Sequence, residues 1–224
     1  MTISMQMDNP CTFPKLHYQR ESPDMLSAKE IRILHQSTTL QWHQGPASCQ
    51  LEGFLQLVCE QHRFNFLLWH EEDIARSPDV SDSQIAAVKR SIDGYNQKRN
   101  DAIEQIDATI ADFLQTQGIA AKNDVPLNSE TPGSIIDRLS ILALRIFHLE
   151  ENLQRDDITE SLRQTVLQKI EIAACQQTDL SHCLDELWNE ILAGRKRHKI
   201  YRQLKMYNDP SLNPYLYNHQ GRKS

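Results

Sequence analysis

The fold is decided by residues 81–118, which read SDSQIAAVKRSIDGYNQKRNDAIEQIDATIADFLQTQG. Apolar side chains recur in this stretch at steps of three and four residues, which is the period of an amphipathic helix. They are Ile85, Val88, Ile92, Tyr95, Ala102, Ile106, Ile110 and Phe113. Ser81 or Asp82 can cap the start, and Gly118 can end the helix. The stretch therefore predicts one helix of about 35 residues.

Two helices are predicted before this stretch. Ser27 is a suitable N-cap, because Glu30 follows three residues later as in a capping box. That helix should end near Gly45-Pro46. Ser48 can cap a second helix, which Ser77-Pro78 stops.

Two more helical stretches follow it. Thr131-Pro132 is an N-cap followed by proline at the first helical position. Residues 135–149 are apolar on nearly every side, so this helix should lie in the middle of the fold. Residues 157–194 stay in helical phase, either as one very long helix or as two joined by a kink. We predict an all-α protein, an antiparallel bundle of four to six helices.

The chain should form one domain with two extensions. Residues 1–26, with three prolines, are predicted to be an irregular arm, residues 27–200 the helical bundle, and residues 201–224 an extended tail packing on the bundle. The tail contains four tyrosines, from Tyr201 to Tyr217.

Composition limits the class of protein. Hydrophobic residues make up 39% of the 224 residues and only 7 are glycine, which suits a globular helical chain. No stretch approaches the ~20 apolar residues of a membrane span, and the start has no apolar block of the signal-peptide kind, so we predict a cytoplasmic protein. The five cysteines are an odd number without a Cys-x-x-Cys pair, and we interpret them as reduced thiols.

The net charge of −6 hides a basic run. The run comprises Arg195, Lys196, Arg197, Lys199, Arg202 and Lys205. Removing these six positive charges from the net charge leaves −12 on the rest of the chain. Such a run can bind phosphate or nucleic acid, but the acidic remainder would repel a polyanion, which disfavours nucleic acid as a partner. We favour a solvated helix end, where cations are stabilised.

The long helix also carries polar residues beside its apolar face. They form one stripe: Lys89, Asp93, Asn96, Asn100, Glu104 and Asp107. An exposed face with ion pairs three and four residues apart would explain the stripe. Arg99 is different, because it lies within the apolar face. A guanidinium there needs a buried carboxylate or a bound anion.

The neighbouring helices bring similar residues. One face of the second helix carries Asn65, Trp69, Glu72 or Asp73, and Arg76; the central helix carries Asp137, Ser140, His148 and Glu151 on one line and Arg138 and Arg145 on another. Because the helices before and after residues 77–81 must be antiparallel neighbours, these faces can meet. The convergence predicts a polar pocket between three helices. A network of ion pairs without a ligand is the alternative.

The residue types suggest roles within such a pocket. We expect ligand binding by Trp69, Arg76, Asn96, Arg99, Asn100, Asp137 and Arg138, with the arginines holding an anion and Trp69 stacking on a base or sugar. Asp73, His70 and Glu104 are the candidates for proton transfer. Glu72, Glu104 and Asp107 are candidate Mg²⁺ ligands, an arrangement that resembles that of all-α nucleotide pyrophosphohydrolases.

Several enzyme families are excluded because their motifs are missing. The sequence contains no Gly-rich phosphate loop, no Gly-x-Ser-x-Gly and no His-Glu-x-x-His.

Four motifs together resemble a known family. They are Trp69-His70-x-Glu72-Asp73-x-Ala75-Arg76, the run from Lys89 to Asp107, Glu130-Thr131-Pro132-Gly133-Ser134-x-x-Asp137-Arg138-Leu139-Ser140, and Lys205-Met206-Tyr207-Asn208-Asp209-Pro210. Over roughly residues 30–217 the chain is similar to the bacterial family catalogued as domain of unknown function 4254. The resemblance implies a helical fold, a bacterial source and an association with surface polysaccharide genes. It assigns no catalytic residues, and the basic run before Tyr201 departs from its pattern.

Three functions remain open. The leading hypothesis is that the protein binds, and can turn over, a phosphate-bearing sugar or nucleotide in the polar pocket. The first alternative is an interaction protein of surface polysaccharide assembly, in which the tail or basic run docks a partner protein. The second is an Mg²⁺-dependent all-α pyrophosphohydrolase. A homodimer is compatible with the long mixed-surface helices.

Overall fold

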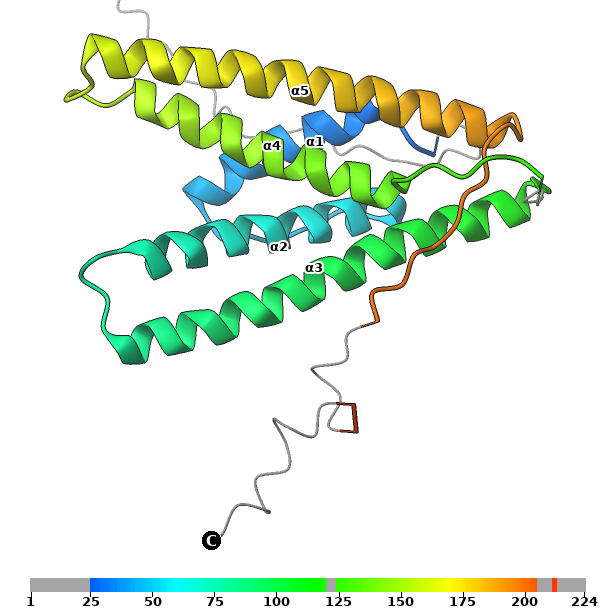
Figure 1. Ribbon diagram of the computed structural model, residues 1–224, viewed down its shortest axis with the longest axis horizontal. Helices are drawn as coiled ribbons and strands as arrows, with labels where there is room; N and C mark the ends of the chain where they lie inside the picture. The colour runs from blue at the N-terminus through cyan, green and yellow to red at the C-terminus, as the bar shows by residue number, and fades with distance from the viewer. Residues whose placement is uncertain (1–24, 120–123, 205–210, 213–224) are drawn as a thin grey trace, which may run out of the picture.

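The computed structural model describes residues 25–119, 124–204 and 211–212, and five α-helices make up most of them (Figure 1). The helices are α1 (Ala28–Gln44), α2 (Gly53–Arg76), α3 (Asp82–Thr116), α4 (Pro132–Leu153) and α5 (Glu160–Leu192). No strand occurs in these residues, and Leu127 and Arg197 form an isolated bridge. The predicted all-α class is confirmed, and residues 160–192 form one helix without a break.

The predicted capping residues begin three of the helices. The Ser27 side chain accepts a hydrogen bond from the Glu30 amide at the start of α1. Ser81 and Thr131 each form a reciprocal capping box, at the starts of α3 and α4. After α3, Gly118 has a φ of 69°, a conformation that glycine adopts without steric cost.

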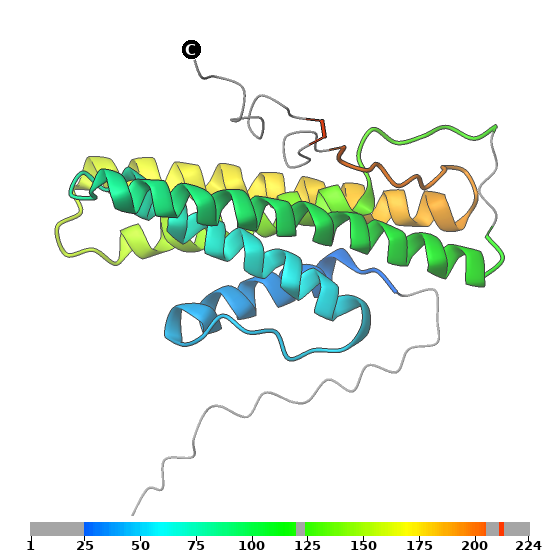
Figure 2. The ribbon, with the colours of Figure 1, turned by 90° about the horizontal axis from the view of Figure 1, so that it is seen from below.

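The helices pack as two antiparallel hairpins with α1 against them. In Figures 1 and 2, α2 lies beside α3, and α4 lies beside α5. The central position predicted for α4 is confirmed, because α4 contacts all four other helices. Its Leu139 is fully buried together with Ile106 and Ile110 of α3 and Leu184 of α5. Burial of each such side chain stabilises the fold by about 1.5–3 kcal/mol.

Helix α1 runs in the same direction as α2 and α4. His35 of α1 stacks on His62 of α2, and eight residues further along both helices His43 contacts His70. Between α2 and α4, His62 contacts Ser140, and eight residues further along both helices His70 contacts His148. Contacts that advance along both helices in the same chain direction show that the helices are parallel. The C-terminal parts of α1, α2 and α4 therefore lie together at one end of the molecule.

The predicted N-cap of the second helix is wrong. Helix α2 begins at Gly53, with Glu52 in the capping position, and Ser48 lies in the connection from α1. The Ser48 carbonyl accepts a hydrogen bond from Trp42 Nε1, and the Leu51 amide donates to Gln56 Oε1. These contacts hold the connection beside α2. The chain thus returns toward the start of α1 before α2 begins, and the two helices run parallel.

The interpretation of the cysteines as reduced thiols is wrong for two of them. Cys49 of this connection forms a disulfide with Cys59 of α2, and the two Cα atoms are 6.0 Å apart. Cys175 and Cys183 are free and exposed on α5. Disulfides persist mainly in oxidising compartments, so this bond does not favour the predicted cytoplasmic location.

Parts of the predicted arm and tail lie outside the described residues, namely 1–24, 205–210 and 213–224. Leu26, at the end of the predicted arm, is buried in the main core. Within the described part of the chain, no helix combines the length and the apolar character that crossing a membrane requires.

Candidate functional site

Asp137 of α4 lies at the centre of a buried hydrogen-bond network. Its Oδ1 accepts hydrogen bonds from Gln61 Nε2 at 2.6 Å and from Asn65 Nδ2 at 2.9 Å, both on α2. From α3, Arg99 donates through Nε to Oδ1 and through Nη2 to Oδ2, both at 2.8 Å. The buried carboxylate that Arg99 required is therefore Asp137. Three helices converge on it, as the polar faces predicted.

The network continues toward α1. Asn65 also donates to Ser140 Oγ at 2.9 Å, and Ser140 Oγ lies 2.7 Å from His62 Nδ1. The other ring nitrogen of His62 lies 2.9 Å from Thr39 Oγ1. Burial lowers the pKa of His62 to about 3, so the ring is neutral at pH 7.

The groups that satisfy Asp137 are all side chains of the protein. A carboxylate with two charged and two amide hydrogen bonds has little capacity left for a ligand. This network therefore corresponds to the predicted alternative to a pocket, a network of ion pairs without a ligand. It joins α2, α3 and α4 to one another.

The other two predicted anion-binding arginines also have carboxylate partners. Arg76 pairs with Glu72 at 2.9 Å, and Arg138 Nη1 donates to both oxygens of Glu130. Both pairs are exposed. Asn96 and Asn100 are half-buried on α3.

The three candidate Mg²⁺ ligands do not come together. Glu72 lies within electrostatic range of Lys89 at the start of α3, and Glu104 is fifteen residues further along the same helix, a rise of about 22 Å. Glu104 Oε1 accepts a hydrogen bond from the Gln203 amide at 2.6 Å.

Asp107, the third candidate Mg²⁺ ligand, lies where α3 contacts the start of α4. It is buried, and its Oδ1 accepts a hydrogen bond at 2.8 Å from the Gly133 amide in the first turn of α4. Burial raises the pKa of its carboxyl group, while hydrogen bonds from Thr131 and Gly133 oppose that rise. A carboxylate at a helix N-terminus is favourably placed, so Asp107 joins α3 to α4.

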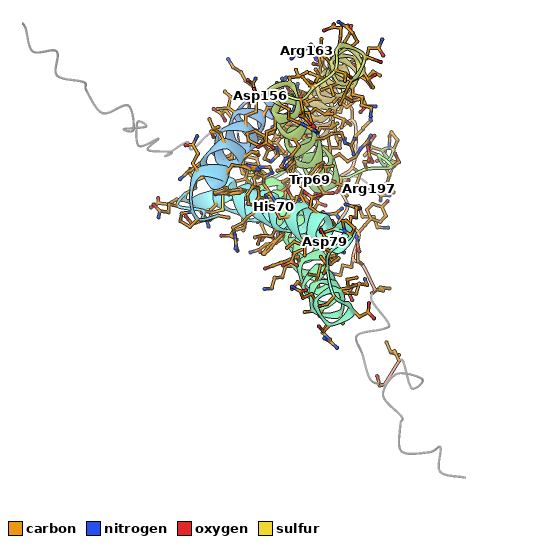
Figure 3. All side chains as sticks on the ribbon, turned by 90° about the vertical axis from the view of Figure 1, so that its left-hand side faces the viewer. Trp69, His70, Asp79, Asp156, Arg163 and Arg197 are labelled. Atoms are coloured by element: carbon orange, nitrogen blue, oxygen red, sulfur yellow. A yellow bond between two sulfur atoms is a disulfide. The ribbon has the colours of Figure 1, made fainter. Side chains whose placement is uncertain are left out.

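Three predicted site residues, Trp69, His70 and Asp73, lie near the C-terminal end of α2. The Trp69 ring stacks on His148 of α4 at a centroid distance of 4.8 Å, and His70 packs against His43 and His148. In the end-on view of Figure 3, Trp69 and His70 lie where α2 approaches α4. Burial, and then the His43 and His148 rings, lower the pKa of His70, whereas Asp73 and Glu151 oppose this. The prediction included His70, Trp69 and Asp73 but missed His43 and the contact with His148.

A cavity lies elsewhere, at the C-terminal ends of α3 and α5. Its volume is about 340 Å³. The wall from α3, the following loop and the end of α5 is largely apolar, with Leu114, Ile119 and Ile191. Another part of the lining is the start of the basic run: Lys196, Arg197 and His198. We call this space the basic cavity. None of the arginines predicted to hold an anion lines it.

Contacts with the rest of the fold hold Lys196, Arg197 and His198, at the start of the basic run, in place. Lys196 Nζ donates to Asn128 Oδ1 at 3.0 Å, and the Arg197 amide donates to the Pro126 carbonyl. His198 Nε2 donates to the Asp107 carbonyl at 2.8 Å. Figure 2 shows residues 193–204 running beside the connection between α3 and α4. Lys196 and Arg197 are therefore parts of a fixed wall, not of a solvated helix end.

A family model described as "Protein of unknown function (DUF4254)" matches residues 55–200. The match covers more than half of the chain, so the chain belongs to this family. It includes all but the first two residues of α2, all of α3 to α5 and the residues of the basic cavity, but it begins after α1 and His43. No curated protein and no solved structure matches the chain significantly.

Proposed function

We propose that this member of the DUF4254 family binds a small molecule bearing a phosphate or a similar anion in the basic cavity. The observation that carries the proposal is the pairing of a cationic wall with an apolar wall around a space of about 340 Å³. This volume lies within the range of about 300–1,000 Å³ that is usual for small-molecule sites.

The chemistry of the two walls favours the ligand class. Lysine and arginine are the common phosphate ligands in proteins, one as a point charge and the other as a planar fork. Lys196 has the neutral amide of Asn128 as its hydrogen-bond partner, and the nearby carboxylate of Glu190 forms its ion pair with Arg195. The apolar side chains of the lining suit the face of a sugar or a base.

The charge distribution favours a small anion over a polymer. The net charge of the chain is −6, in spite of the basic run. A small anion can enter a local positive wall, whereas a nucleic acid would also meet the acidic surroundings. A phosphate-bearing sugar also suits the association with surface polysaccharide genes that the family resemblance implies.

The test is a thermal-shift screen of the purified full-length protein against nucleotides, nucleotide sugars and sugar phosphates. A ligand at about 100 times its Kd adds ~2.7 kcal/mol to the free energy of unfolding, which raises Tm by several degrees for a chain of this size. We expect at least one phosphate compound to do so, and its uncharged analogue to have no effect.

Two matched variants locate the site. Lys196→Gln removes the charge but keeps a donor for Asn128, and we expect it to abolish the shift. Arg195→Gln removes a neighbouring charge that pairs with Glu190 and does not line the cavity, and we expect it to keep the shift. If the screen finds no stabilising compound, or if both variants weaken binding equally, the proposal is wrong.

A further inference from the structure

Three histidines from three helices converge at the end of the molecule opposite the basic cavity. They are His43 in the last turn of α1, His70 on α2 and His148 on α4. One ring nitrogen of each lies within 4.8 Å of one ring nitrogen of each of the others. All three side chains are half-buried. We call this group the histidine centre.

The Nε2 atoms of the histidine centre lack partners. All three are buried, and none has a hydrogen bond. A buried polar atom without a partner costs about 1–3 kcal/mol, and such atoms are rare in folded proteins. Three of them within one cluster of histidines indicate that something besides the protein satisfies them.

The opposite ring nitrogens show which form two of the rings adopt. His43 Nδ1 lies 2.8 Å from the Thr39 carbonyl oxygen, and His148 Nδ1 lies 2.7 Å from Glu151 Oε2. Because a carbonyl and a carboxylate only accept hydrogen bonds, each Nδ1 must carry the proton. In the neutral rings the Nε2 atoms then hold the lone pairs. Metal-binding histidines are typically oriented by this kind of Nδ1 contact.

The surrounding packing fixes the rings in place. The His43 ring stacks on Phe147 at a centroid distance of 4.2 Å, and Phe66 packs edge-on against His70 at 4.5 Å. Trp69 stacks on the His148 ring at a centroid distance of 4.8 Å. A packed aromatic cluster alone would explain these ring contacts, but it would not explain three buried Nε2 atoms without partners on three neighbouring rings.

We infer that His43, His70 and His148 bind a divalent transition-metal ion of the Zn²⁺ or Co²⁺ class through their Nε2 atoms. Imidazole nitrogen suits Zn²⁺, Co²⁺, Ni²⁺ and Cu²⁺, whereas Mg²⁺ and Ca²⁺ take oxygen ligands. Zn–N bonds of about 2.0–2.1 Å in a tetrahedral site place the nitrogens about 3.4 Å apart. The ring nitrogens lie within 4.8 Å of one another, so binding an ion requires the three rings to move closer together.

The three histidines would occupy three of the four positions around a tetrahedral ion, and the fourth position would stay open. Glu151 is already bonded to His148, and Asp73, one turn after His70 on α2, is exposed at the edge of the centre. Three protein ligands with one open position are typical of catalytic zinc sites, whereas closed structural sites have four. The histidine centre is independent of the proposed anion site, and neither proposal requires the other.

The first test is titration of the chelator-treated full-length protein with Co²⁺, followed by visible absorption, and with Zn²⁺, followed by calorimetry. We expect one ion per chain and the intense d–d absorption of tetrahedral Co²⁺. His148→Gln should weaken binding by more than the about 100-fold that outer-shell changes reach, and Glu151→Gln by about 10- to 100-fold. His182→Gln changes an exposed histidine on α5 and should bind as the wild type does.

The second test needs no variant and therefore does not depend on whether a variant folds. X-ray absorption spectroscopy of the wild-type protein with one equivalent of Zn²⁺ should show imidazole nitrogen at about 2.0–2.1 Å. Sulfur scattering at about 2.3 Å would place the ion at cysteine instead, and would overturn the inference. Absence of stoichiometric binding, or equal binding by wild type and His148→Gln, would overturn it as well.

Discussion

Arg99 and Arg138 show how the same side chain acquires different roles in different surroundings. The Arg99 side chain is 26% exposed and its partner Asp137 only 8%, whereas the values for Arg138 and its partner Glu130 are 51% and 38%. An exposed pair stabilises a protein by about 0–1 kcal/mol, because water solvates both charges. Breaking a buried pair leaves a charge without compensation, which costs several kcal/mol.

At the residue scale we therefore predict that Asp137→Asn lowers the free energy of unfolding by about 3–5 kcal/mol. The new amide group would face the donors of Gln61, Asn65 or Arg99. The matched change Glu130→Gln breaks the exposed pair and should cost less than about 1 kcal/mol. Urea denaturation of both variants measures the difference. Equal and small losses would show that the Asp137 network contributes no more than a surface pair.

At the element scale, the approach of α3 to α4 depends on Gly133. A Cβ atom at this position would lie 2.9 Å from Asp107 Oδ1 and 2.9 Å from the Ile103 carbonyl oxygen. The backbone of α3 cannot move away as a flexible side chain could. The absence of a side chain at Gly133 is what allows its amide to reach Asp107.

We predict that Gly133→Ala destabilises the protein by about 1–3 kcal/mol through overpacking. Gly94→Ala is the control, because nothing lies within 4 Å of a Cβ there and alanine favours a helix by up to about 1 kcal/mol. Thermal unfolding should give Tm shifts of opposite sign. A neutral Gly133→Ala would mean that the helices can separate at this point without cost.

At the scale of the whole molecule, the parallel arrangement of α1 and α2 buries two stacked histidines, His35 and His62. Burial lowers the pKa of both, and the neighbouring His62 further lowers that of His35. Above pH 6.5 both rings are neutral in the folded and unfolded states. Below it the unfolded chain takes up protons that the folded chain does not, so stability falls as the pH falls.

We predict that the free energy of unfolding falls by about 1.4 kcal/mol per pH unit for each of these histidines below pH 6.5. For His62 the loss continues down to its folded pKa of about 3. Urea titrations between pH 7 and pH 5 measure the slope. His62→Gln should make it shallower, whatever its effect on absolute stability, and His182→Gln, at an exposed site, should leave it unchanged. An identical slope in all three proteins would contradict the prediction.

Local features of the sequence were sufficient for most helix ends and for one feature of the site. Ser81, Thr131 and Gly118 act through contacts within a few residues, so their positions predicted the boundaries correctly. The position of Arg99 on an apolar face predicted that it needs a partner, because that need follows from helical period and desolvation alone. Ser48 failed as a cap because contacts with Trp42 and the disulfide determine the path of its segment.

What the sequence determined by itself was the all-α class and most of the places where helices begin and end, because both depend on hydrophobic period and capping within one segment. The tertiary structure decided that Asp137 is the partner of Arg99, that α1 runs parallel to α2 and α4, and that His43 meets His70 and His148. Contacts between residues this far apart along the chain depend on how helices pack against one another. Packing direction and register have no local signal that one sequence can show.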